Sequence, residues 1–248
     1  MNPGEYSVKA WSELVPKYMD AMLAAAARSG ARLVTLDNLY MHGRGGTMPI
    51  NEATPVAPIS PKGEIRAREA AKLFAAHERG DVRAVSGRAS DFYGPGGVGT
   101  HFGEMLWKRV LAGQSAQVLV NPDIVHSFHY TEDVAAGLAA LGTGPDDATG
   151  RWWMLPVGPA LTPRQMIAEF GRALGRDVPT EQMPGWLLGL ASLFVPVLKE
   201  LKEMGYQWEQ PFVADDSAFR AKFGVAPTPV ADGARATVEW AKAAFGQK

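Results

Sequence analysis

The sequence predicts an α/β fold, with a partial doubly wound parallel sheet and a smaller C-terminal α+β lobe. Amphipathic helical segments alternate with short apolar runs over the first half of the chain, which is typical of parallel strands joined by helices. Beyond about residue 122 the pattern becomes irregular and rich in Trp and Pro. A length of 248 residues with 46% apolar residues allows a core of the size that this fold requires.

The first predicted helix covers residues 8–29. Apolar side chains, among them Trp11 and Val15, recur there at helical spacing, and Gly30 follows as a stop signal. The short apolar run at 32–36 is then typical of a strand. These segments form the first helix–strand unit of the predicted sheet.

A second unit follows a long loop. Residues 41–60 are rich in Gly, Pro, Asn and Thr, which indicates a loop. Pro61 suits the first turn of a helix, where its missing N–H costs nothing, and this helix is expected to reach about residue 77. Residues 82–90 form the next predicted strand.

The rest of the chain predicts shorter elements. Thr162 is a typical cap for a helix that runs from Pro163 to Leu174. The other expected elements are helices at 101–112, 132–141, 186–204, 215–222 and 231–245 and strands at 117–120 and 152–157. We divide the chain into a first domain over 1–121 and a second lobe over 122–248, with an approximate boundary across which segments can interleave.

Polar residues follow two of the predicted strands. Asp37 and Asn38 come directly after the first strand, and Ser90 and Asp91 stand at the end of the second. In parallel α/β sheets, ligands bind beyond the carboxyl ends of the strands. Geometry alone therefore makes these two strand ends the first place to look for a functional site.

Composition excludes several classes of function. The formal net charge is -1, with 25 basic and 26 acidic residues, so nothing favours nucleic acid or an anionic membrane as a partner. Without cysteine the chain has no disulfide, thiolate nucleophile or Cys–zinc site, which fits the cytoplasm.

The N-terminal residues lack a signal-peptide pattern. The apolar stretch at 183–198 is too short for a membrane span and reads as a buried or groove-lining helix. We expect a cytoplasmic protein with a small-molecule substrate.

One glycine motif invites a dinucleotide-binding interpretation. Residues 94–99 match G-x-G-x-x-G after a strand and before a helix. However, Pro95 removes an N–H that a phosphate loop could use, and three residues separate Ser90 from Gly94, so the turn is not tight. We favour a loop that does not bind phosphate.

Two histidines three residues apart raise the question of a metal site. His126 and His129, with Asp133 as a third ligand, could be arranged around an ion. We favour structural histidines and expect no metal. Neither a G-x-S-x-G nor an H-E-x-x-H motif occurs.

Several segments lie in a fixed order that covers nearly the whole chain. They are the helix end and strand at 25–34, Asp37 to Gly43, Asn51-Glu52-x-x-Pro55, Arg88 to Pro95, His126 to Ala135, and Thr237 to Trp240. In this order they resemble the NAD-dependent epimerase/dehydratase family of extended short-chain dehydrogenases/reductases. The resemblance implies a Rossmann-like sheet with a substrate lobe, and it makes the loop at 94–99 part of the substrate side.

The resemblance also implies positions for catalytic residues. In the family a tyrosine lies four residues before a lysine that lowers its pKa, so that a phenolate can transfer a proton. Lys62 and Arg66 stand at these positions, and Asn38 stands where the family has a catalytic Ser or Thr. Arginine cannot act as a base, and an amide relays no proton. Asn38, Lys62 and Arg66 are thus implied as the catalytic residues of an atypical site, and Asn38, Arg66 and Asp91 as cofactor-binding residues.

Three further residues are implied as substrate contacts: Tyr40, Tyr93 and His126. Tyr40 is also a candidate replacement for the lost catalytic phenol. Apart from the resemblance, Tyr93 would equally fit a packing ring. Likewise Lys62 and Arg66, one helical turn apart, would equally fit a solvated basic face.

The largest departure from the family concerns the dinucleotide. A family member opens with a strand, a Gly-x-x-Gly-x-x-Gly turn and a helix that hold the pyrophosphate. We expect 1–121 to be a truncated domain without this unit, because of a native truncation, a late start codon or a partner chain that supplies it. NAD(P) is implied as cofactor, with an incomplete site. An exposed strand edge beside 32–36 would favour a homodimer.

Two hypotheses about function follow, beside a third possibility that the chain is a remnant that folds poorly. The first is an NAD(P)-dependent epimerase, dehydratase or reductase acting on a sugar nucleotide or a small carbonyl or hydroxyl compound. The second is a non-catalytic ligand-binding or regulatory protein of the same fold. Binding without turnover distinguishes the second from the first.

Overall fold

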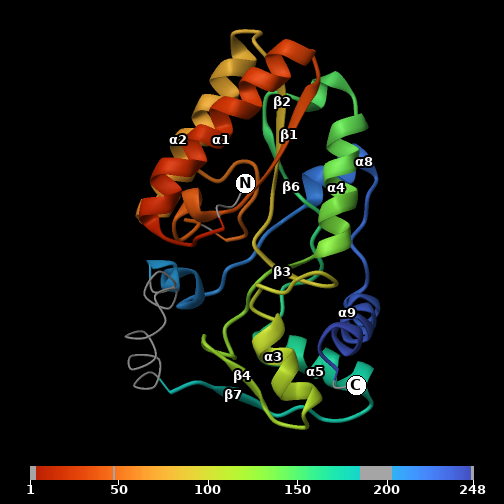
Figure 1. Cartoon of the computed structure of the whole chain (residues 1–248). Helices are drawn as coiled ribbons and strands as arrows, with labels where there is room; N and C mark the ends of the chain where they lie inside the picture. The colour runs from red at the N-terminus through yellow and green to blue at the C-terminus, as the bar shows by residue number, and fades with distance from the viewer. Residues whose placement is uncertain (1–3, 47, 185–202, 247–248) are drawn as a thin grey trace.

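The computed structural model describes residues 4–46, 48–184 and 203–246. It confirms the predicted α/β fold with parallel strands. The main sheet has three strands in the order β1-β2-β6 (Figure 1), formed by β1 (Arg32–Asp37), β2 (Arg83–Arg88) and β6 (Trp152–Met154). Because all three run parallel, their carboxyl ends meet at one edge of the sheet.

Helices cover both faces of this sheet, as Figure 1 shows. Leu33 packs with the helices of one face, and Val34 and Leu36 pack with those of the other. The first pair is α1 (Val8–Ser29) and α2 (Pro61–Glu78), and the second pair is α4 (Thr131–Thr143) and α8 (Ser217–Phe223). Alternation of side chains along the strand thus gives two apolar layers, as in a doubly wound sheet.

The two long helices begin and end where the sequence predicts. The hydroxyl of Ser7 accepts a hydrogen bond from the backbone N–H three residues further on, and Gly30 ends α1 in the left-handed conformation, with φ 67°. Ser60 caps α2 in the same way, with Pro61 in its first turn.

A second lobe is built around aromatic side chains. It contains α3 (Glu104–Leu111), α5 (Pro163–Leu174), α9 (Val230–Phe245) and the parallel pair of β4 (Ala116–Val118) and β7 (Thr180–Gln182). We call its centre the aromatic core, which consists of Tyr93, Phe102, Trp107, Phe128, Tyr130 and Phe170. Thr162 caps α5 with a complete capping box, as predicted.

A short parallel pair joins the two parts of the molecule. β3 (Asp91–Tyr93) pairs with β5 (Phe128–Tyr130) between the main sheet and the aromatic core (Figure 1). Three short 3-10 helices complete the described elements: η1 (Tyr40–His42), η2 (Asp146–Ala148) and η3 (Gly205–Trp208).

The structure differs from the sequence expectation in several places. The strand predicted over 82–90 is divided into β2 and β3, because the chain leaves the main sheet after Arg88 to pair with β5. The helix predicted from 101 begins at Glu104, after a run of tight turns. The helix predicted over 132–141 is α4, which begins one residue earlier at Thr131 and ends at Thr143.

The two predicted segments, 1–121 and 122–248, exchange elements. From the second segment, β6 and α4 pack with β1 and β2, whereas α3 and β4 of the first belong to the aromatic lobe. The helix predicted over 186–204 falls almost entirely outside the described residues. Among the residues that are described, no helix has the length and apolarity needed to cross a bilayer.

Candidate functional site

The carboxyl end of β1 turns sharply into η1. Asp37 accepts a hydrogen bond from the backbone N–H of Asn38 at 2.9 Å, and the amide oxygen of Asn38 accepts one from the N–H of Tyr40 at 3.1 Å. The two side chains therefore shape the turn. The predicted catalytic position Asn38 lies at the expected strand end, with its amide oxygen already engaged by the backbone.

Lys62 lies in the first turn of α2 with a fully buried side chain. Its Nζ is 2.5 Å from an Oε of Glu203, and its backbone N–H donates to the other Oε at 2.7 Å. The ammonium also lies 4.7 Å from the ring centre of Tyr6. The amino group of Lys62 therefore lies between a carboxylate and an aromatic face.

Arg66 lies one turn further along the same face of α2. It is buried, with Nη1 3.5 Å from Oδ1 of Asp37 and its guanidinium 4.4 Å from the ring centre of Trp11. Arg68, by contrast, is exposed and pairs with Glu69. Lys62 and Arg66 thus face the interior at the end of β1. They do not form the solvated basic face that was the alternative interpretation.

Two tyrosine hydroxyls meet above these cations. The hydroxyls of Tyr6 and Tyr40 are 2.9 Å apart, and the Tyr40 ring stacks on Trp11. Burial raises the pKa of Tyr6 to about 12 and raises the pKa of Tyr40 well above its usual value. Neither phenol is therefore prepared to lose a proton near neutral pH. We call this group the crevice cluster: Tyr6, Trp11, Asp37, Tyr40, Lys62 and Arg66.

A second polar group lies at the start of β3. The Nε2 of His126 is 2.8 Å from Oδ2 of Asp91, and the imidazole is stacked between the rings of Trp208 and Phe212. Burial opposes the charge of Asp91, but the hydrogen bond from His126 and the nearby His101 hold its pKa below the usual value. His126 is fully buried, whereas the Asp91 side chain is 35% exposed, so the carboxylate is the part of this pair that solvent reaches.

The two groups are close enough to interact. The negative charge of Asp91 contributes to the raised pKa of both Tyr6 and Tyr40. Among the sequence-predicted residues, the structure therefore brings together Asn38, Tyr40, Lys62, Arg66, Asp91 and His126 beyond the carboxyl ends of β1 and β2.

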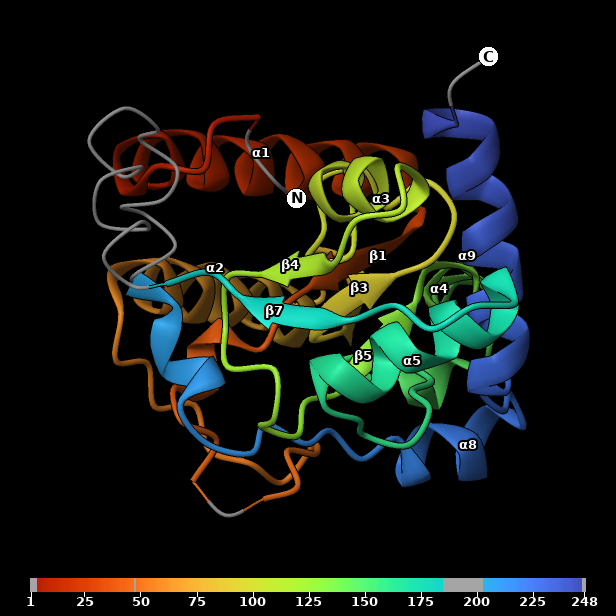
Figure 2. The ribbon, with the colours of Figure 1, turned by 90° about the horizontal axis from the view of Figure 1, so that it is seen from below.

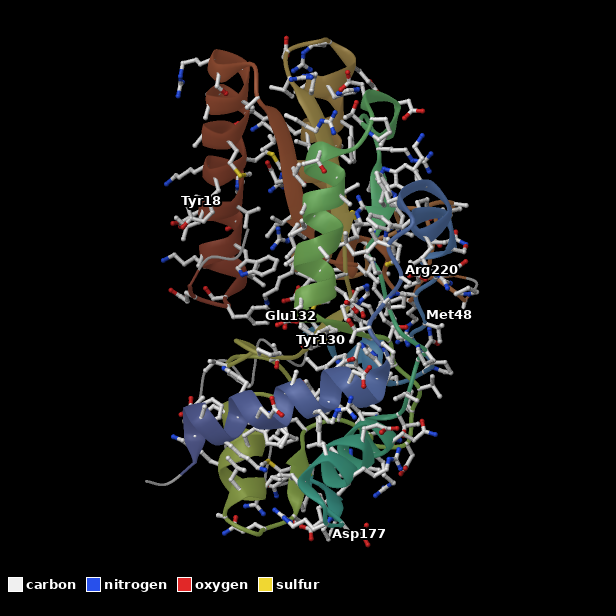
Figure 3. The ribbon with its side chains drawn as sticks, turned by 90° about the vertical axis from the view of Figure 1, so that its right-hand side faces the viewer. Tyr18, Met48, Tyr130, Glu132, Asp177 and Arg220 are labelled. Atoms are coloured by element: carbon white, nitrogen blue, oxygen red, sulfur yellow. The ribbon has the colours of Figure 1, made fainter. Side chains whose placement is uncertain are left out.

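Tyr93 is the predicted residue that the structure places elsewhere. It is 3% exposed, and its ring packs against Tyr130 and Phe170 in the aromatic core. Figure 3 shows Tyr130 at the level where the sheet meets this lobe. These contacts agree with the alternative interpretation, in which Tyr93 is a packing ring.

A buried arginine extends the site under η1. Arg88, at the end of β2, donates from Nη1 to Nε2 of His42 at 2.8 Å and lies 4.4 Å from the ring centre of Trp152. His42 in turn donates from Nδ1 to the carbonyl of Pro55, at 2.9 Å. Burial lowers the pKa of His42 to about 4, so the imidazole is neutral and can accept from Arg88.

Several of these residues were not predicted as site residues. Tyr6 and Trp11 precede the first strand, and Glu203 lies far along the chain, so no local motif connects them with Lys62. The only sequence feature that could have pointed to these residues is their type, because aromatic and acidic side chains can accompany buried cations. Arg88 was visible as part of the family segment, but nothing in the sequence indicated its burial.

The loop at 94–99 uses several of its backbone N–H groups within its own turns. In the loop at 94–99, the N–H groups of Gly97 and Val98 already donate to carbonyls of the same loop, and the N–H of Thr100 donates to Gly97. A phosphate cradle needs such groups free to point at the ligand. That this loop does not bind phosphate therefore stays a prediction.

Comparison with known proteins agrees with the fold and with the predicted family. The sequence profile of the NAD dependent epimerase/dehydratase family matches residues 16–153. No curated protein matches the sequence.

Several solved structures are similar to this chain in fold, although their sequence identity to it is low. A UDP-glucuronic acid 4-epimerase from Bacillus cereus, in complex with NAD, has 16% identity and a TM-score of 0.71 over 92% of this chain and 67% of its own. A dTDP-glucose 4,6-dehydratase from Streptomyces venezuelae has 20% identity and a TM-score of 0.66 over 90% of this chain and 63% of its own. The protein RMD from Pseudomonas aeruginosa, complexed with NADPH, has 14% identity and a TM-score of 0.63 over 86% of this chain and 66% of its own. The chain thus spans about two thirds of the length of these structures.

Proposed function

Because the chain belongs to the NAD dependent epimerase/dehydratase family, we propose that it binds a sugar nucleotide or a small carbonyl or hydroxyl compound beyond the carboxyl ends of β1, β2 and β3. The reaction is an epimerisation, dehydration or reduction of the NAD(P)-dependent kind. The substrate class is supported by the structural neighbours, which include a UDP-glucuronic acid 4-epimerase and a dTDP-glucose 4,6-dehydratase.

One observation carries this proposal. Lys62 and Arg66 project from α2 to the end of β1, where Arg66 meets Asp37 and Lys62 lies under Tyr6. Both cations are buried and paired with carboxylates, and charged groups buried at a strand end are candidates for a functional site. In the proposed function these residues orient the substrate, and the partly exposed Asp91 carboxylate accepts hydrogen bonds from its hydroxyl groups.

NAD(P) is the cofactor that the family implies, and it supplies hydride transfer when it is bound. The described residues offer Arg66 and Asp91 to a ribose, but they offer no pyrophosphate cradle. In the proposed function these residues therefore serve the substrate side of the reaction.

A specific observation favours a second candidate, a non-catalytic ligand-binding protein of the same fold. The family mechanism needs a phenol with a lowered pKa next to a lysine. Here burial raises the pKa of Tyr6 to about 12, and Lys62 is occupied by Glu203. These phenols resemble a structural hydrogen-bonded pair more than an acid–base catalyst.

The two candidates are separated by binding and turnover measured on the same preparation. UDP-glucuronic acid and dTDP-glucose are titrated calorimetrically, and sugar products with NAD or NADP present are followed by chromatography. Turnover that is lost in Lys62→Met, but kept in the exposed control Arg68→Gln, supports the enzyme. Saturable binding without any product supports the binding protein. If neither sugar nucleotide binds, the sugar-nucleotide part of the proposed substrate class is wrong.

A further inference from the structure

The charged side chains at the site differ in how far solvent reaches them. The two cations are almost completely buried, since the side chain of Lys62 is 0% exposed and that of Arg66 is 5% exposed. Each of them faces a carboxylate, which belongs to Glu203 for the lysine and to Asp37 for the arginine. The side chain of Asp91 is 35% exposed. Of these charges, the carboxylate of Asp91 is therefore the one that a ligand reaches most directly.

Within the described residues, no lysine or arginine pairs with the Asp91 carboxylate. Its hydrogen-bond partner is the Nε2 of His126, at 2.8 Å. The Nδ1 of His126 is buried and has no acceptor in the described part of the chain, so the neutral tautomer with its proton on Nε2 fits these surroundings. His101 and His129 also act on Asp91. Burial lowers their pKa to about 4 and about 3, so neither carries a charge near neutral pH.

The position of Asp91 is fixed by its neighbours on both sides. The backbone N–H of Ser90 donates to Nδ1 of His129 at 3.2 Å, and the Nε2 of His129 donates to the carbonyl of Leu155 at 3.3 Å. On the other side, the imidazole of His126 stacks between two aromatic rings. Asp91 opens β3, which lies near the middle of the molecule in both Figure 1 and Figure 2. Because the carboxylate is held in place before a ligand arrives, binding to it costs less conformational entropy.

An ammonium group suits this carboxylate better than a hydroxyl group does. Burial opposes the charge of Asp91, but the hydrogen bond from His126 holds its pKa below the usual value, so the group is ionised at neutral pH. An ammonium donates up to three hydrogen bonds and carries a full positive charge, whereas a hydroxyl donates one and is neutral. The attraction between opposite charges adds to the hydrogen bond of the ammonium, and a hydroxyl lacks it.

We propose that the Asp91 carboxylate makes the site selective for a sugar that carries a protonated amino group, which binds to Asp91 in preference to a neutral hydroxyl. This selectivity rests on the proposed function, because it narrows the substrate class of the same site. It requires no nucleotide on the sugar, since Asp91 contacts the amino group directly. His126 positions the carboxylate through its Nε2–H, and the charge of Asp91 supplies the selectivity.

Titration of matched sugars into the unaltered chain tests the selectivity. The probes are methyl glucoside and its amino-deoxy analogues, in each of which one hydroxyl is replaced by an amino group, at a pH below the pKa of the amine. Binding is followed through the backbone amide signals in nuclear magnetic resonance spectra. We expect at least one analogue to bind at least about tenfold more tightly than methyl glucoside and to shift the signals of Asp91 and His126. Equal affinities for all of the sugars, or no binding of any analogue, overturns the proposal.

Substitution of Asp91 assigns the preference to its charge. Asp91→Asn keeps the size of the side chain and an acceptor for His126, so the amino analogue should lose its advantage over methyl glucoside. The control is Asp177→Asn, at an exposed position of the second lobe that is labelled in Figure 3, and it should leave the preference unchanged. A preference that persists in Asp91→Asn contradicts the proposal.

An uncharged sugar gives the same comparison if thermal melting shows that Asp91→Asn does not fold. Acetylation of the amino group removes its charge, so the N-acetylated analogue should bind the unaltered chain at least about tenfold more weakly than the free amine. Equally tight binding of the acetylated sugar overturns the proposal.

Failure of this proposal can be told apart from failure of the proposed function. If UDP-glucuronic acid and dTDP-glucose do not bind, the sugar-nucleotide part of the proposed function is lost, but the preference for an amino analogue is still measured with the simple sugars. If both sugar nucleotides bind and no amino analogue is preferred, the proposed function stands and the selectivity of Asp91 for an amine is refuted.

Discussion

The crevice cluster and the aromatic core bury side chains of opposite kinds. The aromatic core contains six rings of low exposure and no charged group, whereas the crevice cluster holds Lys62 and Arg66 beside Asp37. Apolar burial stabilises a fold directly. Buried ion pairs contribute little net stability, because desolvation offsets much of the attraction between the charges.

The difference indicates which region maintains the fold and which serves a site. The aromatic core and the helices α3, α5 and α9 around it (Figure 1) hold the second lobe together. The crevice cluster and the neighbouring histidines are maintained against a desolvation cost, as is common where charge is used for binding. If this division is correct, the two regions respond differently to acid and to substitution.

Acid has the largest expected effect, and it acts on the crevice side. Burial lowers the pKa of His42 to about 4 and that of His129 to about 3, from about 6.5 in an unfolded chain. Below about pH 6.5 these histidines therefore bind protons in the unfolded state but not in the folded state. Stability is unaffected by these groups above that pH, and it falls by up to about 3 kcal/mol per pH unit as the pH drops toward 4.

Urea denaturation at a series of pH values measures this dependence. His42→Gln, whose amide oxygen can still accept from Arg88, should reduce the slope by about one proton, or roughly 1.4 kcal/mol per pH unit. An unchanged slope in this variant would show that His42 is not buried in its neutral form.

Truncation within the aromatic core has the next largest effect. Phe170 is 1% exposed and touches Tyr93, Phe102 and Trp107. Phe170→Ala removes this apolar surface and leaves a cavity, so the free energy of unfolding should fall by about 3–5 kcal/mol. Met105→Ala, at a side chain that is 63% exposed, is the control and should change it by less than about 0.5 kcal/mol. Equal effects of the two substitutions would contradict the assignment of the core.

Removing the carboxylate that faces Lys62 has a smaller but diagnostic effect. Glu203→Gln removes the carboxylate charge that lies against the buried amino group of Lys62, and we expect a loss of about 3 kcal/mol in thermal or urea unfolding. The double variant Lys62→Met, Glu203→Gln should recover most of this loss, because the charge and its desolvation are both removed. A double variant less stable than Glu203→Gln would mean that the lysine contributes mainly through packing.

The smallest expected effect concerns the helix cap of the second lobe. Thr162→Ala removes the hydrogen bond to the N–H of Gln165 and should lower the free energy of unfolding by about 1 kcal/mol. Ser12→Ala, at an exposed position inside α1, should change it by only a few tenths of a kcal/mol. The cap would be unimportant if both substitutions gave the same value.

Local patterns in the sequence predicted much of the fold. The positions of Gly30, Pro61 and Thr162 located the helix boundaries, because each acts through its own backbone geometry. The pairing of β4 with β7 was not predicted, since a three-residue strand carries no periodicity that could reveal its partner.

The site was predictable only as far as its residues follow strand ends or match the family. Asn38, Lys62, Arg66 and Asp91 were found in this way, and the structure brings them into one region. The contacts of Tyr6 and Glu203 with Lys62 join segments far apart in the chain, so no sequence spacing could indicate them. Burial of Tyr93 depended on which face of β3 meets the second lobe, which a three-residue strand does not determine.

The central claim is that the described residues provide the substrate side of a family site without the pyrophosphate cradle. Calorimetric titration of NAD and of UDP-glucuronic acid into the chain alone tests it most directly. We expect saturable heat from UDP-glucuronic acid, weakened in Asp91→Asn, and no saturable heat from NAD. One-to-one binding of NAD with no binding of the sugar nucleotide would contradict the account.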